Sequence, residues 1–120
     1  MSKTRTVEKY ISALNARDLN GIVALYSADA TVEDPVGTPV ITGKEAIREF
    51  YSQATCINLQ LELLGDVRVS GNFVAFPFAI KLPAEMGPVR MEVIDTFKFN
   101  EQGLITEMKA YWNEDNCHVV

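Results

Sequence analysis

The sequence predicts a single α+β domain, residues 1–120, in which helices pack on one face of an antiparallel sheet. Apolar residues recur at helical spacing in three segments of the first half, and they alternate with a period of two through most of the second half. Helices followed by strands that short turns connect are typical of layered α+β domains. No repeat, linker or low-complexity segment divides the 120 residues.

The first two helices are predicted from apolar residues three or four positions apart, which lie on one side of a helix. The first spans about Lys3 to Ala16, and Asp18 is placed to cap the second, which should end near residues 27–29. Their apolar stripes consist of Val7, Tyr10, Ile11 and Leu14, and of Leu19, Ile22, Val23 and Tyr26.

A turn-rich segment and a third helix follow. Residues 30–40, ATVEDPVGTPV, begin as a β-prone stretch that two prolines and a glycine interrupt. Because the residue before a proline avoids the helical region, Asp34 should be extended at the edge of a turn. Thr42 followed by Glu45 has the spacing of a capping box and predicts the start of the third helix. The stripe of this helix consists of Ala46, Ile47, Phe50, Tyr51 and Ala54.

The remaining residues alternate as half-buried strands do. Turns are expected at residues 70–72 and 100–103, and residues 83–88 should form a loop. The apolar faces consist of Leu59, Leu61, Leu63, Val67 and Val69, then of Val74, Phe76, Phe78, Ile80 and Leu82, and last of Leu104, Met108, Ala110 and Trp112.

The strand expected at residues 89–100 carries the most informative residue. One of its faces holds five apolar side chains and a single acid, Asp95. Arg90 and Lys98 have the opposite parity and point away from that acid. Burial of an unpaired carboxylate is costly, and the usual response is a raised pKa and a neutral acid. We therefore expect Asp95 to be buried and protonated.

Three tyrosines also place polar groups on apolar faces. Tyr10, Tyr26 and Tyr51 each fall on an apolar stripe of a different predicted helix. A single buried tyrosine is usually a core residue whose hydroxyl finds a neighbouring partner. Three of them together with Asp95 must bond to one another or face a cavity. This combination indicates polar groups inside an apolar pocket, which is typical of a small-molecule site.

Asp34 is the second notable acid, although a turn residue beside a proline can be purely structural. The aromatic residues Phe76, Phe78 and Trp112 share the parity of the Asp95 face, which suits both a core and a ligand wall.

Composition excludes several classes of function. The net charge of −5 and the lack of a basic cluster speak against nucleic acid as a partner. No apolar run approaches the roughly 20 residues that cross a bilayer, and the N-terminus lacks the apolar core of a signal peptide. Cys56 and Cys117 predict reduced thiols in a cytoplasmic protein rather than a disulfide framework. With His118 as the only histidine and no Cys-x-x-Cys pair, we do not expect a transition-metal site. No nucleotide-binding loop indicates a cofactor.

Five segments of the sequence resemble ketosteroid isomerase. They are YISALNARDLNGIVALY at residues 10–26, DATVEDPVG at 29–37, IREFY at 47–51, VID at 93–95 and AYWNEDN at 110–116. The resemblance covers nearly the whole chain in order. It implies the cone-shaped α+β fold of the nuclear-transport-factor-like superfamily, with three N-terminal helices on the concave face of a curved sheet, and it implies a homodimer. Residues 82–89, LPAEMGPV, depart from the family pattern and are candidates for shaping the pocket mouth.

The resemblance also implies roles for individual residues. It places the catalytic base on Asp34 and the two hydrogen-bond donors of the oxyanion hole on Tyr10 and protonated Asp95, the arrangement known in ketosteroid isomerase. The residues that it assigns to supporting or contacting the substrate are Tyr26, Tyr51, Phe76, Phe78 and Trp112. The implied reaction moves the double bond of a 3-oxo-Δ5-steroid into conjugation through a dienolate, with Asp34 carrying the proton and without a cofactor or metal.

Other functions remain open, because one fold serves many functions. One alternative is a polyketide cyclase-like enzyme that acts on another apolar ketone. An epoxide hydrolase is disfavoured, since no Asp–Arg–Asp arrangement falls on pocket-facing positions. A module that binds steroid or lipid without catalysis would use the same pocket, whereas a protein-docking dimer would not need two acids and a tyrosine inside one.

Overall fold

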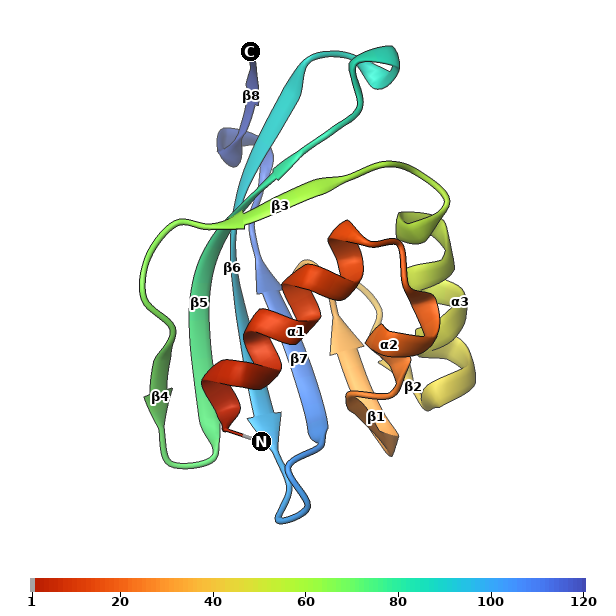
Figure 1. Cartoon of the computed structure of the whole chain (residues 1–120), viewed down its shortest axis with the longest axis vertical. Helices are drawn as coiled ribbons and strands as arrows, with labels where there is room; N and C mark the ends of the chain where they lie inside the picture. The colour runs from red at the N-terminus through yellow and green to blue at the C-terminus, as the bar shows by residue number, and fades with distance from the viewer. Residues whose placement is uncertain (1) are drawn as a thin grey trace.

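The computed structural model describes residues 2–120 and contains three α-helices beside a curved sheet (Figure 1). The helices are α1 (Lys3–Asn15), α2 (Leu19–Val23) and α3 (Lys44–Thr55). The strands are β1 (Tyr26–Glu33), β2 (Ile41–Thr42), β3 (Gln60–Leu63), β4 (Arg68–Ser70), β5 (Phe73–Lys81), β6 (Val89–Phe99), β7 (Ile105–Tyr111) and β8 (Cys117–Val119). Two 3₁₀ turns, η1 (Ala84–Met86) and η2 (Glu114–Asn116), complete the described elements. The predicted α+β class is confirmed.

The sheet is mixed rather than wholly antiparallel. Its main strand order is β2-β1-β7-β6-β5-β3, while β4 pairs with β5 and β8 pairs with β6. The strands β1 and β7 run parallel, and every other pairing among the described strands is antiparallel. Sequence periodicity reveals which side chains share a face but not the direction of a neighbour far away in the chain, so this parallel pair was not predicted.

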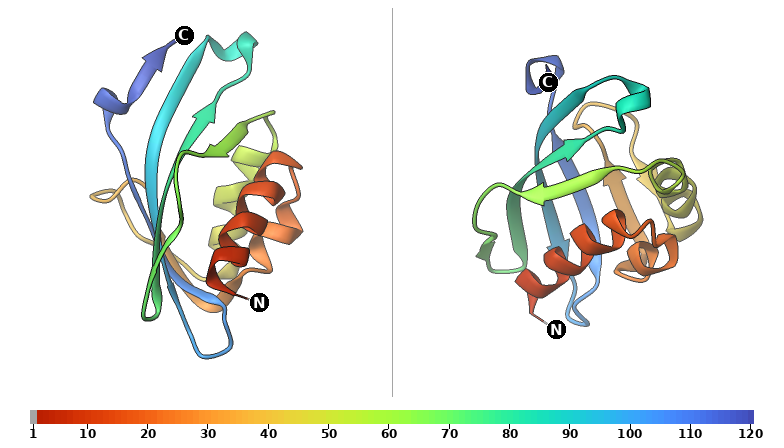
Figure 2. Two further views of the ribbon diagram at one scale, coloured as in Figure 1. Left: turned by 60° about the vertical axis from the view of Figure 1, so that its left-hand side comes forward. Right: turned by 45° about the horizontal axis from the view of Figure 1, so that its top comes forward.

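All three helices lie against one face of the curved sheet, and the long strands β5, β6 and β7 are bare on the other (Figure 2). The buried residues of α1 include Val7, Tyr10 and Leu14, which fall on the predicted stripe. In β6, residues 93, 95, 97 and 99 are buried, while Ile94 and Lys98 between them are exposed. The parity predicted for this strand is therefore confirmed.

Two predictions about helix ends are wrong. The helix that Asp18 caps ends at Val23, and Tyr26 is the first residue of β1 instead of a helical residue. Pairing decides this boundary, because the amide of Ile105 donates to the carbonyl of Leu25 and Tyr26 pairs with Ile105. Thr42 does not cap α3: it lies in β2, and the N-cap is Gly43, which has φ +92° and no side chain to accept a bond.

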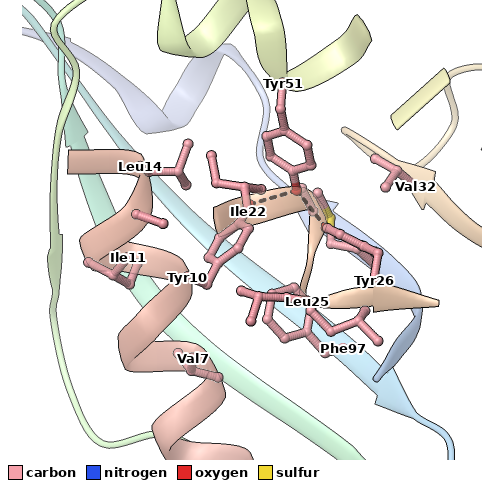
Figure 3. Packing of buried hydrophobic residues seen from close by; sticks show 14 of the residues in the cluster. Val7, Tyr10, Ile11, Leu14, Ile22, Leu25, Tyr26, Val32, Tyr51 and Phe97 are labelled. Carbon is pink, nitrogen blue, oxygen red and sulfur yellow. Dashed lines mark hydrogen bonds between the residues drawn. The ribbon is translucent and has the colours of Figure 1, made fainter. Parts of the chain in front are cut away.

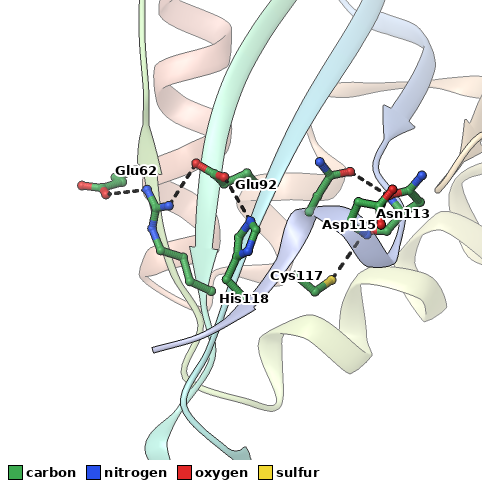
Figure 4. Close-up of polar contacts among 8 residues, drawn as sticks. Glu62, Glu92, Asn113, Asp115, Cys117 and His118 are labelled. Atoms are coloured by element: carbon green, nitrogen blue, oxygen red, sulfur yellow. Dashed lines mark hydrogen bonds and ion pairs between the residues drawn. The ribbon is translucent and has the colours of Figure 1, made fainter.

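The C-terminal strand β8 was not predicted. It pairs with the first residues of β6, and Nε2 of His118 lies 3.4 Å from Oε1 of Glu92 (Figure 4). Arg90 approaches the same carboxylate at 3.0 Å. These contacts are made on the exposed side of β6, away from Asp95. They hold the C-terminal strand β8 against β6.

None of the described helices has the length and apolar character that crossing a membrane requires. Among residues 2–120, no group of three or more His, Cys, Asp or Glu side chains is placed to hold a metal ion.

Candidate functional site

The helices and the concave face of the sheet enclose a cavity of about 520 Å³. Its wall is apolar apart from a few side chains, and a volume of this size suits a small organic ligand. The lining residues come from α1, α3, the turn after β1, the sheet strands and the segment after β7: Tyr10, Leu14, Asp34, Phe50, Tyr51, Gln53, Ala54, Ile57, Leu59, Leu61, Phe78, Ile80, Leu82, Met91, Val93, Asp95 and Trp112.

Asp95 lies in the middle of the sheet. Its strand β6 is central, and Asp95 pairs with Phe76 of β5 on one side and with Ala110 of β7 on the other. Only 2% of the residue is exposed, and its Oδ1 is the one fully buried side-chain oxygen or nitrogen without a hydrogen-bond partner in residues 2–120. Burial raises the pKa of Asp95 well above its ordinary value, and the nearby charge of Asp34 raises it further. Both effects favour the neutral form of this carboxyl, which lines the cavity.

Three tyrosine hydroxyls form a hydrogen-bonded chain beside this acid. The hydroxyl of Tyr51 lies 2.6 Å from that of Tyr26 and 2.9 Å from that of Tyr10 (Figure 3). Each of the three has a pKa raised well above the ordinary value, with burial as the largest cause. All three are therefore neutral and able to donate.

Counting donors limits the ways in which the three hydroxyls can bond. A tyrosine hydroxyl has one hydrogen to donate, and Tyr51 stands between the other two. If Tyr26 donates to Tyr51 and Tyr51 donates to Tyr10, the hydrogen of Tyr10 stays free for a ligand. The hydrogen bond from Tyr51 lowers the pKa of Tyr10, which fits Tyr51 as donor and makes Tyr10 a stronger hydrogen-bond donor.

Asp34 lies at the turn that follows β1 and is partly exposed. The indole Nε1–H of Trp112 donates to its Oδ1 at 2.8 Å. Burial raises the pKa of Asp34, and the Trp112 hydrogen bond opposes that shift because it stabilises the carboxylate. The neighbouring Glu33 accepts a bond from the amide of Gly37 at 2.8 Å instead, so it stabilises the turn.

The structure brings most of the predicted site residues to one cavity. Tyr10, Asp34, Tyr51, Asp95, Phe78 and Trp112 all line it.

Tyr26 and Phe76 do not line the cavity. Tyr26 reaches it only through the hydroxyl of Tyr51. Phe76 is fully buried behind the wall: its ring stacks on Phe78 at 5.5 Å and meets the edge of Tyr10 at 6.2 Å. Their placement suits support of the site rather than contact with a substrate.

Several wall residues were not among the predicted site residues. Four come from α3 and its end, namely Phe50, Gln53, Ala54 and Ile57, and their spacing of three, four and seven positions could have identified them as one stripe. Leu82, the first residue of the unmatched segment 82–89, lines the cavity, as does Met91, two residues after the segment. The amide of Leu82 donates to the carbonyl of Val89 at 3.0 Å. Within the segment, only Leu82 contributes to the described wall.

This chain matches one protein family, and the relatives compared below carry out two kinds of reaction. The SnoaL-like domain matches residues 7–108. A steroid Δ-isomerase of Nocardioides simplex is 38% identical over 106 residues, which cover 88% of this chain and 85% of that protein. The epoxide hydrolase LasB of Streptomyces lasalocidi is 31% identical over 82% of this chain, although the chain spans only 43% of that longer protein.

A solved structure extends the comparison to the fold. The epoxide hydrolase/cyclase-like enzyme SalBIII, described as acting in pyran ring formation in the polyether salinomycin, superimposes with a TM-score of 0.91 at 26% identity. The superposition covers 98% of this chain and 95% of that one.

Proposed function

Because the chain belongs to the SnoaL-like family of the nuclear-transport-factor-like superfamily and is a relative of a steroid Δ-isomerase, we propose that it is a steroid Δ5-to-Δ4 isomerase. The substrate is a 3-oxo-Δ5-steroid, which the apolar wall of the cavity accommodates. The reaction passes through a dienolate and ends with the double bond in conjugation with the carbonyl.

Asp34 is the proton-carrying base. As a carboxylate it takes a proton from the carbon between the carbonyl and the double bond, and it returns that proton to the far end of the conjugated system. Partial exposure and the hydrogen bond from Trp112 keep enough of this acid ionised at neutral pH, while burial raises its pKa toward that of a more effective base.

Tyr10 and Asp95 are the donors of the oxyanion hole. The negative charge that develops on the carbonyl oxygen of the dienolate needs donors that are already in place before the reaction. Tyr10 can offer its free hydroxyl hydrogen, and neutral Asp95 can offer its acid proton.

The observation that carries the proposal is the unpartnered carboxyl of Asp95 in the same cavity as Asp34. A structural acid in a core would be expected to bond a neighbour, whereas a neutral donor on the wall of a cavity suits a ligand oxygen. Two acids with opposite protonation in one pocket are the groups that proton transfer beside a carbonyl requires.

The direct test is an absorbance assay for the conjugated enone formed from 5-androstene-3,17-dione. We expect rapid conversion by the native chain and a large loss in the Asp34→Asn variant, with binding retained. Tight binding of a phenolic steroid without any conversion would instead favour a steroid-binding module.

A second candidate reaction is the opening of an epoxide, either by water or by a hydroxyl of the same molecule. The relatives LasB and SalBIII favour this class, and the same two acids could serve it: Asp95 would donate to the epoxide oxygen and Asp34 would take the proton of the attacking hydroxyl. Turnover of an apolar hydroxy-epoxide, with no conversion of the Δ5-ketone, would replace the isomerase proposal. The polyketide cyclase-like alternative is tested in the same way with an apolar polyketone.

We also propose a homodimer that forms through the helix-free face of the sheet. Pro77, Ile94 and Tyr111 are cross-strand neighbours there, and Ile94 and Tyr111 are 48% and 45% exposed. An apolar row on the outer face of a sheet is suited to burial against a second copy. Sedimentation should show a dimer for the native chain and a shift to monomer for Ile94→Asp. A native chain that stays monomeric at high concentration would contradict the proposed homodimer.

A further inference from the structure

Gln53 is the one polar side chain on the described cavity wall that the proposed reaction does not use. In the proposed reaction the two acids and Tyr10 act on the substrate. The hydroxyl of Tyr51 is bonded within the tyrosine chain, and the indole N–H of Trp112 is bound to Asp34. The side-chain amide of Gln53 has no hydrogen-bond partner within residues 2–120.

Gln53 is the polar member of a face of α3 that is otherwise apolar where it lines the cavity. Phe50, Gln53, Ala54 and Ile57 are spaced as one face of α3 and its end, and all four line the cavity. The other three are apolar. A glutamine on this face therefore places two N–H donors and a carbonyl acceptor on an otherwise apolar wall.

Gln53 lies at the mouth of the cavity. It is exposed, whereas Tyr51, two residues earlier, is only 2% exposed and reaches the tyrosine chain. The last turn of α3 points toward the end of the molecule that carries the β5–β6 connection (Figure 1). The exposed Gln53 and the buried Asp95 thus differ in their distance from solvent within the same cavity.

The turn that carries Gln53 is held in place by Arg17. The guanidinium donates from Nε to the carbonyl of Thr55 at 2.9 Å and from Nη2 to the carbonyl of Cys56 at 3.1 Å. These are terminal carbonyls of α3, which otherwise lack helical partners. A fixed helix end holds the backbone of Gln53 in a constant place at the cavity.

The charges of the cavity decide what kind of group Gln53 can bind. No Lys or Arg is among the described lining residues, and two of those residues are acids. An anionic group would find no cation on this wall and would be repelled by the Asp34 carboxylate. A neutral oxygen needs only a donor or an acceptor, and the amide supplies both.

We propose that Gln53 is a specificity-determining residue that hydrogen-bonds a neutral oxygen, a ketone or a hydroxyl, at the end of the substrate opposite the enolised carbonyl. The inference rests on the proposed isomerase function and narrows its substrate class to apolar ketones with a second, uncharged oxygen at the far end.

The test compares two steroids that differ only at that end: 5-androstene-3,17-dione and 5-androsten-3-one, which lacks the second oxygen. Gln53→Met keeps the length and the helix propensity of the side chain and removes the amide. Loss of one neutral hydrogen bond should raise KM for the dione about 2- to 10-fold, leave its kcat unchanged, and leave KM for the mono-ketone within about 2-fold.

Two further variants sharpen the result. Gln102→Met makes the same replacement at an exposed glutamine in the β6–β7 turn and should change neither KM. Gln53→Glu retains an acceptor and loses the N–H donors. It should therefore weaken recognition of the ketone more than that of the corresponding 17-hydroxy steroid.

The outcomes separate the two proposals. If the native chain converts both steroids and Gln53→Met changes both KM values equally, or neither, the role of Gln53 is overturned while the isomerase stands. If neither steroid is converted, the isomerase proposal falls, and quenching of the single tryptophan, Trp112, measures binding of the same pair. Selective loss of dione binding in Gln53→Met then supports the role of Gln53, and equal loss or no binding at all overturns it.

Discussion

The middle of β6 and the turn after β1 present the same chemical group, a carboxyl, to one cavity in two different surroundings. Asp95 sits between two neighbouring strands, 2% exposed, and its Oδ1 has no partner in the described chain. Asp34 sits at a partly exposed turn with an indole N–H bound to its carboxylate. Burial raises the pKa of both acids, but only Asp34 has a bound donor that opposes the shift. A carboxyl becomes an acid or a base according to its neighbours rather than its identity.

The largest expected effect comes from removing the base. Asp34→Asn keeps the size of the side chain and the cavity, and loses the proton acceptor. We expect turnover of the Δ5-ketone to fall by about 10² to 10⁴. Affinity for a phenolic steroid should persist in the same variant, and near-native turnover would show that another group is the base.

The second-largest effect is expected from removing Asp95, a hydrogen-bond donor of the proposed oxyanion hole. Asp95→Ala should lower turnover by about 10² to 10³, because the developing oxyanion loses one prepared donor. Asp95→Asn keeps a neutral N–H donor and should lose less. Circular dichroism of both variants checks that the fold survives. If Asn proves as harmful as Ala, donation by a neutral group is not the role of Asp95.

Tyr10→Phe removes the other donor and tests the tyrosine chain. The loss in turnover should again be about 10² to 10³. Tyr26→Phe, which removes the outermost hydroxyl of the chain without touching the cavity, is the matched control and should cost less. Equal losses in the two variants would contradict the direction assigned to the chain.

The pH dependence of stability measures the state of Asp95 in another way. Because burial raises its folded pKa above the unfolded value of about 3.9, the stability that neutral Asp95 contributes is complete below that value and is lost as pH rises through the folded pKa. The free energy of unfolding of Asp95→Asn minus that of the native chain should grow with pH above about 4, by at most about 1.4 kcal/mol per unit. Denaturant titrations at several pH values give this difference, and a difference that stays constant would mean that Asp95 has an ordinary pKa.

The smallest effect should come from removing the hydrogen bond that distinguishes the surroundings of Asp34 from those of Asp95. Trp112→Phe removes the donor that opposes the raised pKa of Asp34. The acidic limb of the kcat/KM profile should move upward by about 1 to 2 pH units, since a hydrogen bond to a charged group is lost. On the plateau at higher pH, kcat/KM of Trp112→Phe should differ from the native value less than that of the Asp34, Asp95 and Tyr10 variants. An unmoved limb would show that the indole does not tune the base.

Much of the site could be predicted from local pattern, because parity and helical spacing depend only on residues a few positions apart. The alternation in β6 identified Asp95 as an acid on an apolar face, and the stripe of α1 placed Tyr10. The same reasoning failed for Tyr26, where helical spacing continued past Val23 but pairing with β7 ended the helix.

The sequence by itself therefore determined the α+β class and which side chains face inward. Only the tertiary structure decided the parallel pairing of β1 with β7, the unpartnered state of Asp95, and the place of Gln53 on the cavity wall. The physical reason is the separation along the chain: Tyr10 meets Tyr51 across 41 positions, and Trp112 meets Asp34 across 78. Local periodicity reports the direction of a side chain, and only the packing of distant segments reports what it meets.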